Sequence, residues 1–229
     1  MTMNAHENFV QLQQWVYQQG IAKMGVTQID EELKTKFYLS PDELQDFQFA
    51  ISLAVRLSQA VLESLKDRPT LLYKWHYRQA NNFLDAVAFR LADKIQQAGY
   101  HALPIAASQI IDWKEQLGHL SHRHVAEAAG LGWIGRNNLL VTPEFGAQVR
   151  LVTVLTSMPL EIGEELPFSC GSCHNCISAC PAGALGEGPQ DYNYEKCFTL
   201  MDHFARKLNI GVHICGLCVK ACPGNSKLQ

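Results

Sequence analysis

The sequence has 229 residues, of which 47% are hydrophobic and 18% charged, a balance typical of a folded globular protein and not of a disordered chain. Asp and Glu number 22 against 19 Lys and Arg, so the net charge of −3 gives no basic excess that would point to nucleic acid or an anionic membrane. No basic and apolar leader opens the chain, and Arg56 interrupts its most apolar later run. We therefore expect a cytoplasmic protein without a membrane segment.

The first hundred residues predict helices that alternate with strands. Apolar residues at helical spacing, namely Phe9, Leu12 and Val16, predict an opening helix that stops at Gly20. The elements expected in this part are a helix over 5–19, a strand in 21–29, a helix start at Ser40 and Pro41, a buried strand over 49–55, a long amphipathic helix over 71–99 and a strand in 101–107.

The next sixty residues complete this core. A short helix over 122–130 leads into a glycine-punctuated loop, "GLGWIGRNN" at 130–138, and β-rich segments follow at 139–143 and 148–157. The expected fold class is therefore α+β, with an α/β core over residues 1–164 and a cysteine-rich module over 165–229.

All eight cysteines lie in that module, and their spacing is the strongest signal in the sequence. The first run has the pattern C-x2-C-x2-C-x3-C-P and consists of Cys170, Cys173, Cys176 and Cys180. The second set is Cys197, Cys215, Cys218 and Cys222, whose last three members repeat the end of the same pattern. Without an export signal, thiols in this number favour metal ligands over disulfides.

This pattern is typical of bacterial ferredoxins with two [4Fe–4S] clusters, in which the fourth cysteine of each run ligates the other cluster. We therefore assign cluster I to Cys170, Cys173, Cys176 and Cys222, and cluster II to Cys180, Cys197, Cys215 and Cys218. The alternative is a pair of four-thiolate zinc sites, but these usually present separate C-x2-C knuckles. Two iron–sulfur clusters imply one-electron transfer.

The loop over 130–138 is the second candidate site. Gly130, Gly132 and Gly135 would let the backbone approach a large flat cofactor, and Asn137 and Asn138 offer amide hydrogen bonds. The alternative is a glycine-rich turn between a helix and a strand.

The stretch "AGLGWIGRNNLLVTPEFGAQVRLVTVLTSMPLE", followed by the cysteine run, resembles the epoxyqueuosine reductases and their relatives, the corrinoid reductive dehalogenases. Weaker likenesses lie in "WVYQQGIAKMGVTQI", "FAISLAV" and "YRQANNFLDAVAFRLADKI". The resemblance implies a nitroreductase-like core that holds cobalamin, reduced through the two clusters with cluster I nearer the corrin. The cofactor-binding residues that it suggests are Gly130, Gly132, Trp133, Gly135, Arg136, Asn137 and Asn138.

The sequence departs from the resembling family at its proton donor. The position of the family's aspartate falls at Gln116, and the nearest acids are Asp112 and Glu115. Because an amide cannot deliver a proton as a carboxylic acid does, either the register is shifted or another group acts. The candidates for that group are Tyr77, His119 and His122.

These candidates also have ordinary interpretations. Tyr77 lies among aromatic residues that could simply pack, and His119, His122 and His124 form either a metal or cobalt site or a set of solvated side chains. Arg136 and Arg150 could hold an anionic group.

The partners expected are a small-molecule substrate and a low-potential electron donor such as a ferredoxin or flavodoxin. The chain ends seven residues after Cys222, without the helical-repeat extension that many epoxyqueuosine reductases add for tRNA, so we expect weak or absent tRNA binding. The competing hypothesis is a two-cluster electron-transfer protein without corrin, which serves a partner protein or another small ligand.

Overall fold

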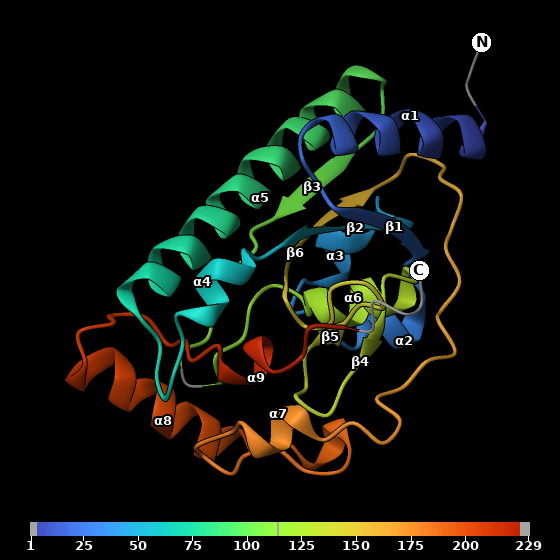
Figure 1. The fold of residues 1–229 in the computed structure, drawn as a ribbon. Coiled ribbons are helices and arrows are strands. Elements are labelled where there is room, and N and C mark those ends of the chain that lie inside the picture. Colours follow the sequence, from blue (N-terminus) through green and yellow to red (C-terminus); the bar gives the residue numbers. More distant parts are fainter. Residues whose placement is uncertain (1–3, 114, 225–229) are drawn as a thin grey trace. The chain divides into compact units, whose positions relative to one another are not determined.

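A computed structural model describes residues 4–113 and 115–224, which form two compact units (Figure 1). The first, called the sheet unit, comprises the described residues up to Val55 together with Asn81–Leu131 and Arg150–Leu166. The second, called the cysteine unit, comprises Arg56–Ala80, Gly132–Val149 and the described residues from Pro167 onward. The cysteine-rich segment thus shares its unit with two earlier segments. The boundary expected between residues 164 and 165 had assigned both of these segments to the core. As a division into functional domains, that boundary stays a prediction.

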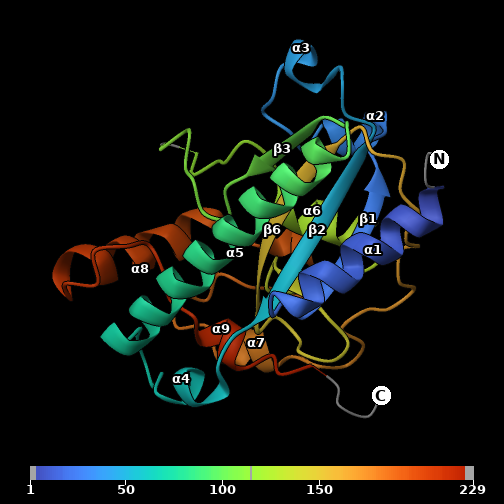
Figure 2. The same cartoon turned by 90° about the horizontal axis from the view of Figure 1, so that it is seen from above.

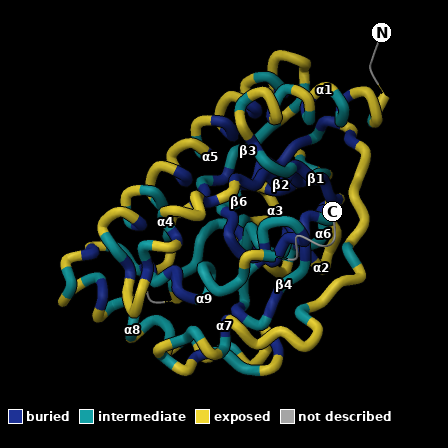
Figure 3. Tube along the Cα trace, viewed as in Figure 1, coloured by how far each residue is buried: buried dark blue, intermediate teal, exposed yellow. Residues whose placement is uncertain are grey.

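The sheet unit is built on a four-stranded sheet in the order β1-β2-β6-β3. The strands are β1 (Lys23–Gln28), β2 (Phe49–Arg56), β3 (Ala102–Ile105) and β6 (Val149–Thr156). β1 pairs antiparallel with β2, and β3 pairs antiparallel with β6. The six central residues of β2 are all buried, as expected for an apolar strand covered on both faces (Figure 3).

Helices cover both faces of this sheet (Figures 1 and 2). α1 (Ala5–Gln18) and the part of α5 (Leu71–Gln97) from Asn81 onward lie over one face, and α6 (His122–Ala128) lies over the other and contacts β1. Two short helices, α2 (Glu31–Lys34) and α3 (Pro41–Leu44), follow β1. Asn4 caps α1 and Ser40 caps α3, each in a capping box with a glutamate.

Besides the first part of α5, up to Ala80, the cysteine unit has further elements, most of them short. They are α4 (Gln59–Glu63), β4 (Trp133–Ile134), β5 (Leu140–Val141), α7 (Asn175–Ser178), the 3-10 turn η1 (Pro189–Asp191), α8 (Tyr194–Lys207) and α9 (Leu217–Lys220). β4 and β5 form an antiparallel hairpin, and α9 packs against both α4 and α7. The expectation of a loop throughout 130–138 is therefore wrong at Trp133 and Ile134, because these residues pair with Val141 and Leu140.

The observed elements give a mixed α+β fold with a cysteine-rich C-terminal region, in agreement with the expected class at that level. Within the described ranges, no helix combines the length and the apolar character needed to cross a membrane.

Candidate functional site

The cysteines sit on a repeated local arrangement within the cysteine unit. Cys176 lies in the one-turn helix α7, and Cys218 lies in the one-turn helix α9 that packs against it. Cys180 and Cys222 each follow their helix, and Cys197 lies on α8. All eight thiols are free.

The first set of cysteines is coupled electrostatically. Burial raises the pKa of the Cys222 thiol to about 11, and the charges of Cys170 and Cys176 raise it further. Burial also raises the pKa of Cys176, followed by the charges of Cys170 and Cys173. Cys222 thus interacts with members of the first run although it stands at the end of the second.

In the second set, a cysteine of the first run interacts with the later cysteines. Burial raises the pKa of the Cys215 thiol to about 11, with further contributions from Cys197 and Cys180. Cys218 has its pKa raised by burial and then by Cys215, Cys197, Cys180 and, last, Cys176. Cys180 therefore interacts with the later cysteines, and Cys176 links the two sets.

A bound cation would reverse these shifts, because metal ligands are thiolates and metal binding releases the thiol protons. Four thiolates in each of two neighbouring sets suit two four-iron clusters, in which each cysteine binds a different iron. The donor set therefore fits the clusters that the spacing predicts, and the assignment of ligands stays a prediction.

Hydrogen-bond donors surround the sulfur atoms. The indole Nε1 of Trp133 donates to the Sγ of Cys170 at 3.5 Å, and the backbone N–H of Ala184 donates to the Sγ of Cys180 at 3.4 Å. The backbone N–H of Ala147 donates to the carbonyl oxygen of Cys222 at 3.1 Å. Burial raises the pKa of Cys197, and a hydrogen bond with the Tyr192 side chain opposes that shift.

Arg136 holds the loop of the first two cysteines. Its guanidinium donates to the carbonyl oxygens of Cys173 at 2.9 Å and Gly171 at 2.8 Å, and its Nε lies 3.8 Å from the carboxylate of Glu187. The Arg136 side chain is only 14% exposed. Arg136 therefore has a structural role in shaping this loop, beside which a role in cofactor binding stays a prediction.

Protein atoms occupy the places that side chains at the three loop glycines would take. A Cβ on Gly132 would meet the carbonyl oxygen of Val141, and a Cβ on Gly130, whose φ is +74°, would meet that of Glu164. A Cβ on Gly135 would lie 2.5 Å from Val141 Cγ2 and 3.2 Å from Cys170 Sγ. Close packing within each unit thus explains these glycines without a cofactor.

The two asparagines of the loop differ in their surroundings. Asn137 is 4% exposed, its Oδ1 accepts a hydrogen bond from the N–H of Leu139 at 3.3 Å, and its Nδ2 finds no acceptor among the described residues. Asn138 is partly buried and has a positive φ of 56°, as Asn tolerates in tight turns.

The candidate proton donors are divided between the two units. Tyr77 is partly buried in the portion of α5 that belongs to the cysteine unit, whereas His119 and His122 belong to the sheet unit. Both ring nitrogens of His122 are engaged, with Thr153 Oγ1 at 2.8 Å and the carbonyl oxygen of Ala106 at 3.0 Å. Over residues 4–113 and 115–224, no three His, Cys, Asp or Glu side chains, His119, His122 and His124 included, converge on the position of a single metal ion. A four-iron cluster does not require such convergence, because each of its cysteines binds a different iron.

Gln116, at the position of the resembling family's aspartate, lies in a turn. Gln116 has a positive φ of 55°, and its Nε2 donates to the carbonyl oxygen of Trp113 at 2.6 Å. Asp112 and Glu115 are exposed, and the Oδ1 of Asp112 accepts from the N–H of Glu115 at 3.1 Å. Arg150, the other cation considered for anion binding, donates to Asn81 Oδ1 at 2.9 Å within the sheet unit.

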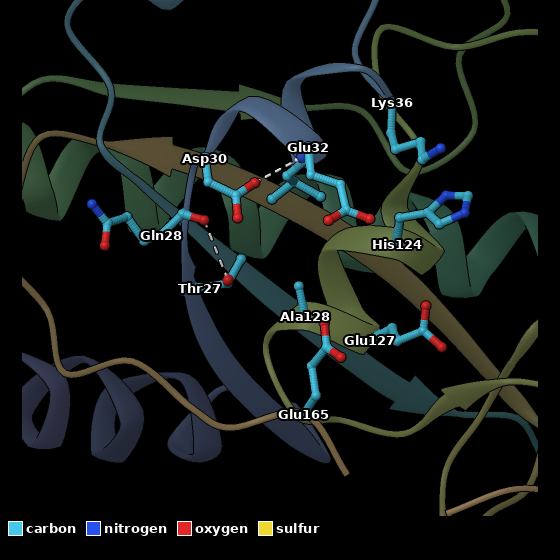
Figure 4. A pocket seen from close by; sticks show the side chains of 10 residues that line it. Thr27, Gln28, Asp30, Glu32, Lys36, His124, Glu127, Ala128 and Glu165 are labelled. Carbon is cyan, nitrogen blue, oxygen red and sulfur yellow. Dashed lines mark hydrogen bonds between the residues drawn. The ribbon is translucent and has the colours of Figure 1, made fainter. Parts of the chain in front are cut away.

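Sequence reasoning missed a polar pocket of about 210 Å³ in the sheet unit, beside α2 and α6 (Figure 4). The ionisable side chains that line it are Asp30, Glu32, Lys36, His124, Glu127 and Glu165. Burial lowers the pKa of His124 to about 4, and the charges of Arg123 and Lys36 lower it further. Apart from His124, which the sequence analysis considered as part of a histidine site, its residues come from separate segments and share no motif, so the sequence did not indicate the pocket.

Two curated relatives are epoxyqueuosine reductases. The protein of Bacillus cereus is 26% identical over 231 residues, which cover 97% of this chain and 58% of that protein. The protein of Bacillus subtilis is 36% identical over 116 residues, which cover 47% of this chain and 30% of that protein. The chain thus spans little more than half the length of the relatives it matches. No family model matches it.

Solved structures agree in fold. A crystal structure of epoxyqueuosine reductase with an epoxyqueuosine-modified tRNA stem loop superposes with a TM-score of 0.67 at 22% identity, covering 93% of this chain and 64% of that one. A reductive dehalogenase, described with a mechanism for B12-dependent dehalogenation, superposes with a TM-score of 0.79 at 17% identity, covering 97% and 32%.

Proposed function

Since this chain belongs to the superfamily of the epoxyqueuosine reductases and the reductive dehalogenases, whose members named above are oxidoreductases, we propose that it is an iron–sulfur reductase. Its cysteine unit carries cluster I on Cys170, Cys173, Cys176 and Cys222, and cluster II on Cys180, Cys197, Cys215 and Cys218. The observation that carries the proposal is the packing of α7, which carries Cys176, against α9, which carries Cys218, so that the ends of the two cysteine runs lie together.

The two clusters take single electrons from a low-potential donor, a ferredoxin or flavodoxin, and pass them toward an electrophilic small molecule. A corrinoid bound by the core would supply low-valent cobalt for the reduction. The residues of this chain hold the clusters: Arg136 fixes the carbonyl groups around Cys173, and N–H groups of Trp133 and Ala184 donate to the sulfur atoms of Cys170 and Cys180.

The second candidate function is electron transfer without corrin, to a partner protein or another small ligand. The packing at Gly132 and Gly135 favours it, because atoms of Val141 and Cys170 lie against both glycines and account for them without a cofactor. No proton-transfer residue is assigned in either case.

Cobalamin uptake separates the two functions. Anaerobic protein with full iron content is incubated with reduced cobalamin, desalted, and examined by visible absorption, with cobalamin desalted in the absence of protein as the control. The reductase retains corrin bands in a fixed ratio to protein. A spectrum with only the broad sulfur-to-iron absorption rejects the corrinoid reductase and leaves the electron-transfer function.

We further propose that tRNA is not a substrate, because the net charge of −3 provides no excess of cations for phosphate contacts. Filter binding to an epoxyqueuosine-modified anticodon stem loop at physiological ionic strength should show no saturable complex. Salt-sensitive binding together with reduction of the epoxide would contradict this expectation.

A further inference from the structure

Trp133 is placed to act on the sulfur of one cysteine in the first set. Its indole N–H, which can only donate, points at the Sγ of Cys170 at 3.5 Å. The pairing of β4 with β5 fixes its backbone, and Phe168 packs edge-on against its ring at 6.0 Å between centroids. The ring is therefore held in the orientation that aims the N–H at sulfur.

We propose that Trp133 is a positioning residue that sets the reduction potential of cluster I by donating its indole N–H to the sulfur of Cys170. The inference rests on the proposed iron–sulfur function. Reduction adds one electron to the cluster without forming or breaking a covalent bond, and N–H dipoles aimed at sulfur stabilise the added negative charge. Their effect is to raise the potential of cluster I selectively.

Cluster II has its own side-chain donor, which provides a matched control. Tyr192 bonds the sulfur of Cys197, a proposed cluster II ligand, within the same unit. Trp133→Phe and Tyr192→Phe each remove one polar hydrogen and keep an aromatic ring. The two substitutions should therefore affect different clusters.

The experiment is a redox titration of anaerobic protein with dithionite, followed by electron paramagnetic resonance, after iron and sulfide have been quantified. Trp133→Phe should make reduction of one cluster about tenfold less favourable, a shift of about 59 mV to lower potential for one electron, and leave the other wave in place. Tyr192→Phe should move only the other wave. Unchanged waves at full iron content in Trp133→Phe, or equal shifts of both waves, overturn the proposal.

A second measurement uses the unaltered protein, so it holds even if a variant loses its cluster. Protein labelled with indole-¹⁵N tryptophan and reduced by one electron should show a ¹⁵N coupling to the cluster spin in electron–nuclear double resonance. No coupling in protein with both clusters intact overturns the inference alone. Wild-type protein that takes up no iron and sulfide overturns the proposed function as well.

Discussion

At the scale of single residues, His122 joins three segments of the sheet unit. The Ala106 carbonyl can only accept, so Nε2 carries the ring proton and Nδ1 accepts from the hydroxyl of Thr153. Burial lowers the pKa of His122 to about 4, the hydrogen bond to Ala106 opposes the shift, and Arg150 adds to it. A neutral ring with both nitrogens engaged ties α6 to β6, and a catalytic role for this residue stays a prediction.

The first prediction concerns this histidine. Because its pKa in the folded state, about 4, lies below the ordinary value of 6.5, the unfolded chain binds the proton first as the pH falls. Stability is therefore full above the ordinary value and is lost as the pH falls toward the folded value, by about 2 kcal/mol between about pH 7 and about pH 5. Thermal unfolding followed by circular dichroism should show that acid lowers the unfolding temperature less in His122→Gln than in the wild type. Equal drops would show that His122 does not carry this dependence.

Residue identity alone could not distinguish a catalytic from a structural role for these side chains. The histidines, Tyr77 and Arg136 all belong to types that serve both catalysis and packing, and only their partners distinguish the two. For Arg136, those partners are the carbonyl groups of Cys173 and Gly171, which backbone folding brings within reach from 35 or more residues away. Sequence patterns carry no information on such contacts.

At the scale of elements, hydrophobic periodicity predicted the sheet unit well. The expected helices and strands are confirmed as α1, β1, α3, β2, α5, β3 and α6, and the two β-rich segments after the loop as β5 and β6. These elements have a buried face, and burial is what imposes a period on the sequence.

The helix α8 was not predicted, although its apolar residues Tyr194, Phe198, Met201 and Phe204 recur at helical spacing. Of its 14 residues, Phe204 is the one that is buried. Stacking replaces burial there: the Tyr194 and Phe198 rings lie 5.6 Å apart, and His213 stacks on Phe198 at 5.0 Å. Asn193 caps its first turn.

The second prediction tests the turn into α9. Gly216 has a φ of +84°, and a Cβ there would lie 2.6 Å from the ring of Tyr73. Gly216→Ala should displace the segment that carries Cys215 and Cys218 and lower the iron retained at cluster II. Gly183→Ala is the matched control, because Gly183 has a φ of +56° with open space around its Cβ position. Both variants carry a backbone strain of about 1–2 kcal/mol, so equal iron retention would exclude the contact with Tyr73 as the cause.

At the scale of the whole chain, the cysteine spacing indicated which thiols belong together, whereas the composition of the units could not be predicted. Residues 56–80 and 132–149 lie in the cysteine unit although the expected core included them. Their membership depends on long-range contacts such as the bond from Gln148 Nε2 to the Lys220 carbonyl at 3.0 Å. Local patterns predict elements, and the tertiary contacts decide how the elements are grouped.

The third prediction tests the crossed assignment, in which the fourth cysteine of each run ligates the cluster of the other run. Cys222→Ala should remove a ligand from cluster I, and Cys180→Ala should remove one from cluster II. Each variant should retain about four irons, with a different wave lost from the redox titration. Loss of the same wave in both variants would contradict the crossed assignment.

The central claim is that the eight thiols bind two [4Fe–4S] clusters, and the most direct test is the metal and sulfide content of protein isolated without oxygen. About eight irons and about eight acid-labile sulfides per chain are expected, with no bound zinc. Tightly bound zinc without labile sulfide, at about two ions per chain, would contradict the account and identify the two sets of thiols as zinc sites.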